Sequence, residues 1–259
     1  MILNRIVGDK RGELERTISR LPLVDIKARA ADAPVVRDFA GGLRIPGRVA
    51  IIAEVKKASP SKGLIRADFN PVNIAKAYEA NGAAAISVLT ESNYFQGSIE
   101  FLRAIREAGV GIPLLRKDFI FDPYQVYEAR ANGADAFLLI ASILDVTQMT
   151  DLYALGRELG MEVLAEAHDG ADLDKITSAG FRVVGINNRD LKSFSVDINT
   201  TGRLKHLVPK GSVLVSESGI STIEDIKRVR EIGADAALIG EAIMREKDFG
   251  AKLKELAEA

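Results

Sequence analysis

Residues 51–61 read I-I-A-E-V-K-K-A-S-P-S, and the rest of the chain repeats the pattern that begins there. The first residues form an apolar run, which is typical of a strand buried on both faces. Glu54 and Lys56 stand on alternate residues, so the two-residue period of a strand points both to one face. Pro60 has no N–H to give to a sheet, which predicts that the strand ends there and a loop begins. Opposite charges at the end of a buried strand are usually paired or employed in function.

Seven further apolar strands follow, each after an amphipathic pattern that ends at a glycine. These glycines are Gly82, Gly109, Gly133, Gly160, Gly180, Gly211 and Gly233. Their spacing of about 20 to 31 residues is the length of one strand–helix unit. Eight such units, counted from a strand beginning at Val49, predict a closed (β/α)8 TIM barrel of the α/β class. An open doubly wound sheet is the alternative, but its glycine-rich first turn is replaced here by K-A-S-P at 57–60.

The first 47 residues differ from this repeat. Apolar residues stand among charges at near-helical spacing, which predicts one or two amphipathic helices. Prolines and the Gly41-Gly42 pair interrupt the chain before the first strand. We therefore expect an N-terminal helical extension, residues 1–47, on a catalytic barrel domain, residues 48–259. The sequence does not decide whether the extension covers the barrel or shapes the mouth of its site.

The composition excludes several classes of protein. The chain of 259 residues has a formal net charge of −1 and no basic run, which argues against a nucleic-acid partner. It has no cysteine and two histidines, so disulfides, thiol catalysis, cysteine-ligated zinc or iron–sulfur sites and a three-histidine metal site are excluded, and no metal is expected. There is no apolar run of roughly 20 residues and no signal-peptide core. We expect a soluble cytoplasmic protein, a monomer by default, without a membrane partner.

Polar residues gather at the carboxyl ends of the predicted strands, where barrels carry their active sites. The candidate acids, bases and amides are Glu54, Lys56, Lys117, Glu166, Asn187 and Glu217. For Glu54 and Lys56 taken alone, the alternative is a purely structural ion pair. For Lys117 taken alone, the alternative is a side chain that extends into water. Two lysines and three glutamates on one rim are difficult to explain by structure alone.

Two further signals come from loops on the same rim. The loops after the seventh and eighth strands, 217–221 and 238–242, place glycines where barrels bind phosphate through backbone N–H groups. Turn formation is the alternative there. Phe95, Phe119 and Phe121 follow the second and third strands and predict a flat apolar wall for an aromatic substrate, unless they pack under the loops.

Other polar residues near the rim receive structural interpretations. His168 is interpreted as a residue at a helix start rather than a catalyst. Asp118 and Asp190 are interpreted as loop or cap residues, and the charged run 245–248 as a solvated helix face. The residues alone thus predict a metal-free barrel enzyme that acts on a phosphorylated, partly apolar substrate by acid–base chemistry.

Seven motifs on this rim resemble indole-3-glycerol-phosphate synthase of tryptophan biosynthesis. They are I-I-A-E-V-K-K-A-S-P-S, S-V-L-T-E-x-x-Y-F-x-G-S, L-L-R-K-D-F-I, A-E-A-H-D, G-I-N-N-R-D-L, S-E-S-G-I and L-I-G-E-A. They occur in family order from the first strand to the last. The resemblance implies a cofactor-free carboxy-lyase that converts 1-(2-carboxyphenylamino)-1-deoxyribulose 5-phosphate into indole-3-glycerol phosphate, carbon dioxide and water.

The resemblance also implies a role for each candidate residue. Lys117 would be the general acid that protonates the ribulose carbonyl, and Glu166 a base or electrostatic stabiliser. Glu54 and Lys56 would assist, with Lys56 also holding the substrate carboxylate or phosphate. The remaining expected contacts are Asn187 and Glu217 in the polar network, Ser59 and Arg189 on anionic groups, Ser218, Gly219, Gly240 and Glu241 around the phosphate, and Phe95, Phe119 and Leu138 along the anthranilate. The Glu241 carboxylate would repel a phosphate, so its backbone N–H is the expected donor.

Two points stay open at the level of sequence. Burial and Lys56 would lower the pKa of Lys117, whereas neighbouring glutamates would raise it. Alternative functions are a sister barrel such as phosphoribosylanthranilate isomerase, a flavin-binding barrel that uses the same anion site, and a non-catalytic barrel scaffold. The isomerase is expected to need a cysteine, which this chain lacks, and a scaffold has no need of Glu54, Lys117 and Glu166.

Overall fold

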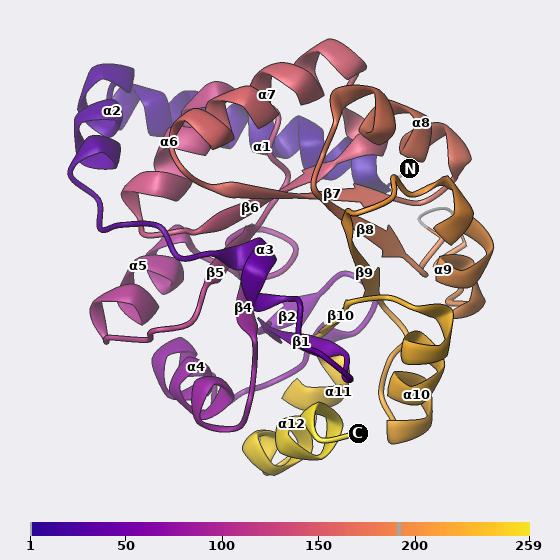
Figure 1. The fold of residues 1–259 in the computed structure, drawn as a ribbon. Coiled ribbons are helices and arrows are strands. Elements are labelled where there is room, and N and C mark those ends of the chain that lie inside the picture. The colour runs from indigo at the N-terminus through magenta and orange to yellow at the C-terminus, as the bar shows by residue number, and fades with distance from the viewer. Residues whose placement is uncertain (1, 191–192) are drawn as a thin grey trace.

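Eight parallel strands close into a barrel in the computed structural model, which describes residues 2–190 and 193–259 (Figure 1). The barrel strands are β1 (Ala50–Val55), β4 (Ala85–Leu89), β5 (Leu114–Lys117), β6 (Ala136–Ile140), β7 (Glu162–Ala167), β8 (Val183–Asn187), β9 (Val213–Glu217) and β10 (Ala236–Ile239). The first and last strands pair in register, with Ala50 opposite Ala236 and Ile52 opposite Leu238. The predicted (β/α)8 TIM barrel is therefore confirmed.

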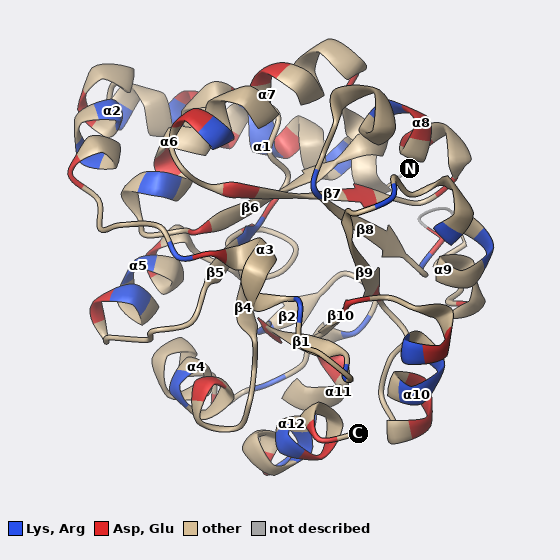
Figure 2. Cartoon of the chain, viewed as in Figure 1, with Lys and Arg blue, Asp and Glu red and all other residues tan. Residues whose placement is uncertain are grey.

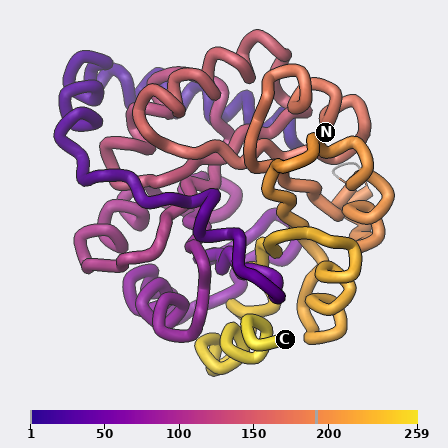
Figure 3. Tube along the Cα trace, in the orientation of Figure 1, coloured from indigo at the N-terminus to yellow at the C-terminus, as the bar shows by residue number. Residues whose placement is uncertain are grey.

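Helices alternate with these strands and cover the outer face of the sheet. They are α4 (Pro71–Ala80), α5 (Ile99–Glu107), α6 (Pro123–Ala131), α7 (Val146–Glu158), α8 (Gly170–Ala179), α9 (Asn199–Leu204), α10 (Ile223–Ile232), α11 (Glu241–Met244) and α12 (Phe249–Ala257), with the short turns η1 (Ala141–Ile143) and η2 (Lys205–Leu207). The Cα trace passes once around the barrel, so that α12 returns to lie beside α4 (Figure 3). Six of the seven predicted glycines close helices with positive φ, as at Gly180, whose φ is 73°, whereas Gly211 lies in a turn beyond η2.

Apolar side chains lie on both sides of the sheet. One core fills the space between sheet and helices, and a second, with Ile52, Leu164 and Val215, fills the barrel interior. Charged residues of both signs lie mainly on the outward faces of the helices, as on α10 (Figure 2). Within the described residues, none of the helices is both long and apolar enough to cross a membrane.

The N-terminal segment forms three helices rather than the predicted one or two, namely α1 (Ile2–Arg20), α2 (Leu23–Ala31) and α3 (Phe39–Gly42). The third helix is too short for its periodicity to be recognised, and it closes the amino end of the barrel with Phe39 and Leu43. Figure 1 draws α3 in front of the strands and α1 behind them, at the opposite end. The loop after β1 also contains an unpredicted hairpin, β2 (Ala58–Ser59) and β3 (Gly63–Leu64). The domain boundary at residue 47 stays a prediction.

A buried ion cluster holds α1 against the carboxyl end of β5. Lys10 Nζ lies 3.1 Å from Asp118 Oδ2, and Arg116 Nη2 donates to the same oxygen at 3.1 Å. Thr90 Oγ1 also donates to it, at 2.6 Å, while the other oxygen accepts the N–H of Phe119 at 2.9 Å. Burial alone would raise the pKa of Asp118, but Lys10 and Arg116 outweigh it and lower that pKa. Asp118, interpreted from sequence as a loop or cap residue, is thus the buried anchor of α1.

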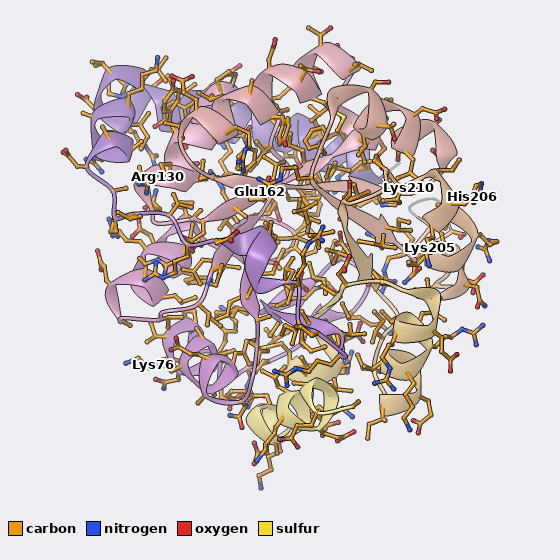
Figure 4. The ribbon with its side chains drawn as sticks, in the orientation of Figure 1. Lys76, Arg130, Glu162, Lys205, His206 and Lys210 are labelled. Atoms are coloured by element: carbon orange, nitrogen blue, oxygen red, sulfur yellow. The ribbon has the colours of Figure 1, made fainter. Side chains whose placement is uncertain are left out.

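Replacing Lys10 by methionine should weaken this anchor. Methionine keeps the apolar stem but removes one of the two cations that compensate the buried Asp118. Since hydrogen bonds to charged groups contribute about 1.5–3 kcal/mol, we expect the free energy of unfolding in urea to fall by about 1–3 kcal/mol. Lys76→Met, at an exposed position on α4, is the matched control and should change it by less than about 0.5 kcal/mol (Figure 4). Equal unfolding free energies for the two variants would contradict the anchoring role.

Candidate active site

A cavity of about 470 Å³ opens at the carboxyl ends of the barrel strands. Every candidate site residue taken from the sequence lines this cavity. They are Glu54, Lys56, Ser59, Phe95, Lys117, Phe119, Leu138, Glu166, Asn187, Arg189, Glu217, Ser218, Gly219, Gly240 and Glu241. The structure therefore brings the candidates together in one place, while the role of each stays a prediction.

Four charged side chains form the floor of the cavity. Glu54, Lys117, Glu166 and Glu217 come from β1, β5, β7 and β9, which are alternate strands around the barrel. Side chains from alternate strands share one interior layer in this fold. A layer that is usually filled by branched apolar residues is here occupied by three acids and one lysine.

Lys117 is held between two of the acids. Its Nζ lies 2.9 Å from Glu166 Oε2 and 3.2 Å from Glu217 Oε2. Burial would lower the pKa of Lys117, but the negative charges of Glu166, Glu217 and Glu54 outweigh it and raise that pKa. The direction of the Lys117 pKa shift, which the sequence leaves open, is therefore upward and favours the protonated ammonium.

The two acids around Lys117 hold different charges. Burial, helped by the nearby Glu166 carboxylate and opposed by Lys117, raises the pKa of Glu217 to about 8. Burial also acts against ionisation of Glu166, but Lys117 and His168 outweigh it and place the pKa of Glu166 well below its usual range. Glu217 Oε1 is buried and, within the described residues, makes no hydrogen bond, which suits a neutral acid better than a carboxylate. Near neutral pH the pair therefore shares one proton, with Glu166 ionised and Glu217 protonated.

Glu54 and Lys56 form the ion pair that their spacing predicts. Lys56 Nζ donates to Glu54 Oε2 at 3.0 Å and lies 5.9 Å from the centroid of the Phe95 ring. Both side chains face the cavity. Lys56 therefore lies between the acidic floor and the aromatic side of the cavity.

Asn187 and Arg189 extend the polar network from the end of β8. Asn187 Nδ2 donates to Glu166 Oε1 at 3.2 Å, and Asn187 Oδ1 accepts the N–H of Arg189 at 3.0 Å. In the same loop, Asp190 Oδ1 accepts the N–H of Ser193 at 2.8 Å, as suits a loop residue. Leu191, the last residue of the G-I-N-N-R-D-L motif, lies outside the described residues.

The aromatic wall contains two of the three predicted phenylalanines. Phe95 and Phe119 lie with ring centroids 6.3 Å apart on one side of the cavity. The assignment of Phe121 to this wall is wrong. Its ring lies 4.8 Å from the guanidinium of Arg11 and packs against the cluster that contains Leu14. Phe121 thus belongs to the contact between α1 and the barrel.

The predicted phosphate loops have tight backbone conformations. Ser218 and Gly219 have φ of 70° and 82°. Gly240 caps the N-terminus of α11, and a Cβ there would approach Glu54 Oε2 so closely that the Glu54 side chain would have to move. The carboxylate of Glu241 accepts from Arg245 Nε at 2.9 Å.

Sequence reasoning missed three parts of this site. Ile2, Leu3 and Ile6 of α1 line the cavity, because α1 lies across its mouth. Arg245 lines it too, although residues 245–248 are all exposed as predicted, in the turn after α11 rather than on a helix face; its spacing of four from Glu241 was the available signal. His168 contacts Glu166, and its spacing of two from that residue was the signal, the same one that linked Glu54 with Lys56. Among the described residues, no group of three or more histidine, aspartate or glutamate side chains is arranged to hold a metal ion.

Replacing Gly240 by alanine should disturb the ion pair without unfolding the barrel. The new methyl group would displace Glu54 and remove the partner of Lys56. Small displacements of positioned groups are costly in catalysis, so we expect kcat/KM to fall by about tenfold in steady-state assays. Gly202→Ala is the control, because its Cβ would meet Ile232 at an ordinary 3.5 Å far from the site. A wild-type kcat/KM in the Gly240 variant would contradict the close approach.

Known proteins match this chain in sequence and in fold. A family model described as indole-3-glycerol phosphate synthase matches residues 3–256. A relative of that name from Dehalococcoides mccartyi is 50% identical over 260 residues, covering 99% of this chain and 100% of the relative. Another, from Roseiflexus sp. (strain RS-1), is 50% identical over 262 residues, covering 98% and 97% of the two chains.

Solved structures share the fold at low sequence identity. A 3-hexulose-6-phosphate synthase from Salmonella typhimurium has a TM-score of 0.62 at 14% identity, covering 81% of this chain and 97% of that one. A thiamine phosphate pyrophosphorylase from Pyrococcus furiosus has a TM-score of 0.63 at 14% identity, covering 85% and 96%. These structures support the barrel alone, whereas the family match and the curated relatives span nearly the whole sequence. The chain belongs to the indole-3-glycerol phosphate synthase family.

Proposed function

We propose that this chain closes the ring of 1-(2-carboxyphenylamino)-1-deoxyribulose 5-phosphate to give indole-3-glycerol phosphate, with Lys117 as general acid and Glu166 as base or electrostatic stabiliser. One observation carries the assignment of roles. The Lys117 ammonium lies between Glu166, whose pKa is lowered, and Glu217, whose pKa is raised, at the floor of a cavity with an aromatic wall. Acid, base and flat apolar surface are the three elements that this reaction needs.

The first chemical step joins a ring carbon to the ribulose carbonyl carbon. As that bond forms, the carbonyl oxygen gains negative charge and takes a proton from Lys117. The raised pKa keeps Lys117 protonated in the resting site but makes it a weaker acid, so its proton is transferred only as the strongly basic oxygen develops beside it. The lone pair of the aniline nitrogen drives the attack, and the Glu166 carboxylate stabilises the positive charge that develops. Loss of carbon dioxide restores the aromatic ring, and loss of water completes the indole.

The other candidates hold the substrate in the reactive orientation. Phe95, Phe119 and Leu138 would hold the anthranilate ring against the carbonyl carbon. The backbone of the loops at Gly219 and Gly240 would bind the phosphate. The remaining contacts follow the sequence expectation, with Ser59, Lys56 and Arg189 on anionic groups, Asn187 on Glu166, and Ser218 and the N–H of Glu241 on the phosphate.

The direct test is to supply this substrate to the purified protein and follow the fluorescence of the indole product. The chain contains no tryptophan, so the signal has no protein indole background. We expect turnover without any added metal or cofactor. Absence of turnover with correctly folded protein would refute the proposed reaction.

We also propose that the enzyme works in the cytoplasm as a monomer and without a nucleic-acid partner. The near-neutral charge of −1 and the lack of a basic run support this proposal. Light scattering at micromolar concentration should give a mass near 28.0 kDa. A mass twice as large would indicate a dimer and refute the proposed monomer.

A further inference from the structure

His168 lies directly behind Glu166, outside the lining of the main cavity. It follows β7 and precedes Asp169, the residue that caps α8. Its Nε2 lies 3.2 Å from Glu166 Oε1 and its Nδ1 lies 3.6 Å from Asp172 Oδ2. The side chain is 12% exposed. The sequence interpretation as a residue at a helix start places it correctly but misses this contact.

The contacts of Glu166 separate its two oxygens. Oε2 faces Lys117, on the side of the reacting groups, at 2.9 Å. Oε1 faces Asn187 Nδ2 and His168 Nε2, each at 3.2 Å. His168 therefore supports the carboxylate from the side opposite the proposed acid and leaves the cavity face of Glu166 open.

The charges around His168 favour its protonated form. Glu166 faces it from β7 and Asp172 from α8, and the N–H of His168 also donates to Asp172 Oδ2 at 3.1 Å. Lys175 lies 3.7 Å from the other oxygen of Asp172 and donates to two backbone carbonyls at η1, while Lys117 lies beyond Glu166. Burial would lower the pKa of His168, but the two carboxylates outweigh it and raise that pKa to about 10.

We propose that His168 is a positioning residue, a buried imidazolium clamped between Asp172 and Glu166 that fixes the orientation and the negative charge of Glu166. It does not touch the substrate. The catalytic consequence rests on the proposed role of Glu166, whereas the clamp itself does not. Without the imidazolium, the cation left in contact with Glu166 among the described residues would be Lys117, which is also the proposed proton donor.

The clamp can be tested without any turnover, because the chain has only one other histidine. His206 is exposed at the edge of the molecule, where its ring contacts the carbonyl of Arg203 (Figure 4). In His206→Gln protein, a histidine NMR titration reports His168 alone. We expect the imidazolium to persist beyond pH 8, and Glu166→Gln or Asp172→Asn in the same background to lower its midpoint by at least one unit. A midpoint at or below the ordinary 6.5, or one that neither substitution moves, would overturn the proposal.

The effect on the reaction is tested with His168→Gln, whose amide is polar but carries no charge. Loss of the positive charge raises the pKa of Glu166, so the acidic limb of the kcat profile should move to higher pH. We expect kcat at neutral pH to fall by about tenfold with KM little changed, and His206→Gln to match the wild type. A lower kcat with an unmoved acidic limb, or a wild-type profile, would overturn the positioning role. If this variant does not fold, the NMR titration still tests whether His168 is an imidazolium held between Asp172 and Glu166. Inactive wild type would refute the proposed reaction and leave the titration as the test of the clamp.

Discussion

Lys117→Ala should lower kcat by about 10²–10⁴-fold and leave the barrel folded. General acid catalysis by a positioned side chain contributes rate factors of this size, and alanine supplies no proton. The substitution also removes the cation that Glu54, Glu166 and Glu217 surround. The electrostatic stabilisation of the charges that develop during the reaction therefore changes as well. Steady-state kinetics by indole fluorescence measure the loss.

Two controls separate catalysis from folding in this variant. The circular dichroism of Lys117→Ala should match the wild type, because the three acids can take up protons where the cation is lost. Lys76→Ala, on the exposed face of α4, should retain wild-type kinetics. Wild-type turnover in Lys117→Ala would remove the acid role from this residue, and a loss confined to Lys56→Ala would transfer the role to Lys56.

Glu166→Gln should lower kcat by on the order of 10²-fold or more, whereas Glu217→Gln should cost less than about tenfold near pH 7. Glutamine has the shape of a protonated glutamic acid. It therefore reproduces Glu217, which is protonated near neutral pH, but not Glu166, which is ionised. Both variants replace a glutamate by glutamine in the same cavity, so each serves as the control for the other.

The pH dependence should distinguish the same two residues. Glu217 loses its proton as the pH rises through about 8, which adds a negative charge beside Lys117. That charge raises the pKa of Lys117 further and makes it a weaker acid, so wild-type kcat should decline above pH 8. Glutamine at position 217 cannot ionise, and its profile should stay flat there. A larger loss in Glu217→Gln than in Glu166→Gln would reverse the assignment of charges.

The fold and most of the candidate site follow from local rules. Two-residue alternation was enough to put Glu54 and Lys56 on one face, and the rule that barrel sites lie at carboxyl ends brought in Lys117, Glu166 and Glu217. The family motifs supplied the roles, which stay predictions.

What the sequence did not predict depends on contacts between distant segments. Phe121 lies in the same loop as Phe119, so the sequence predicts the same role for both. In the structure α1 packs over Phe121 and separates it from the cavity wall, and the sequence does not reveal where α1 packs. Asp118 was predicted as a loop or cap residue because its partner Lys10 on α1 reaches it only in the folded barrel, although Arg116, two residues away, was a local signal. His168 has a usable local signal, its spacing of two from Glu166, but its polar loop favours a residue at a helix start instead.

The closure of the barrel by its first and last strands has a consequence for synthesis on the ribosome. β1 carries Glu54, and Gly240, which lies against it, follows β10 near the end of the chain. The helix α1 is made before the barrel strands, yet its anchor Asp118 is made much later. A nascent chain that stops before β10 therefore lacks one wall of the cavity even when its other strands have paired. Catalytic activity therefore requires β10 as well as β1, and its appearance during synthesis should mark the pairing of these two strands.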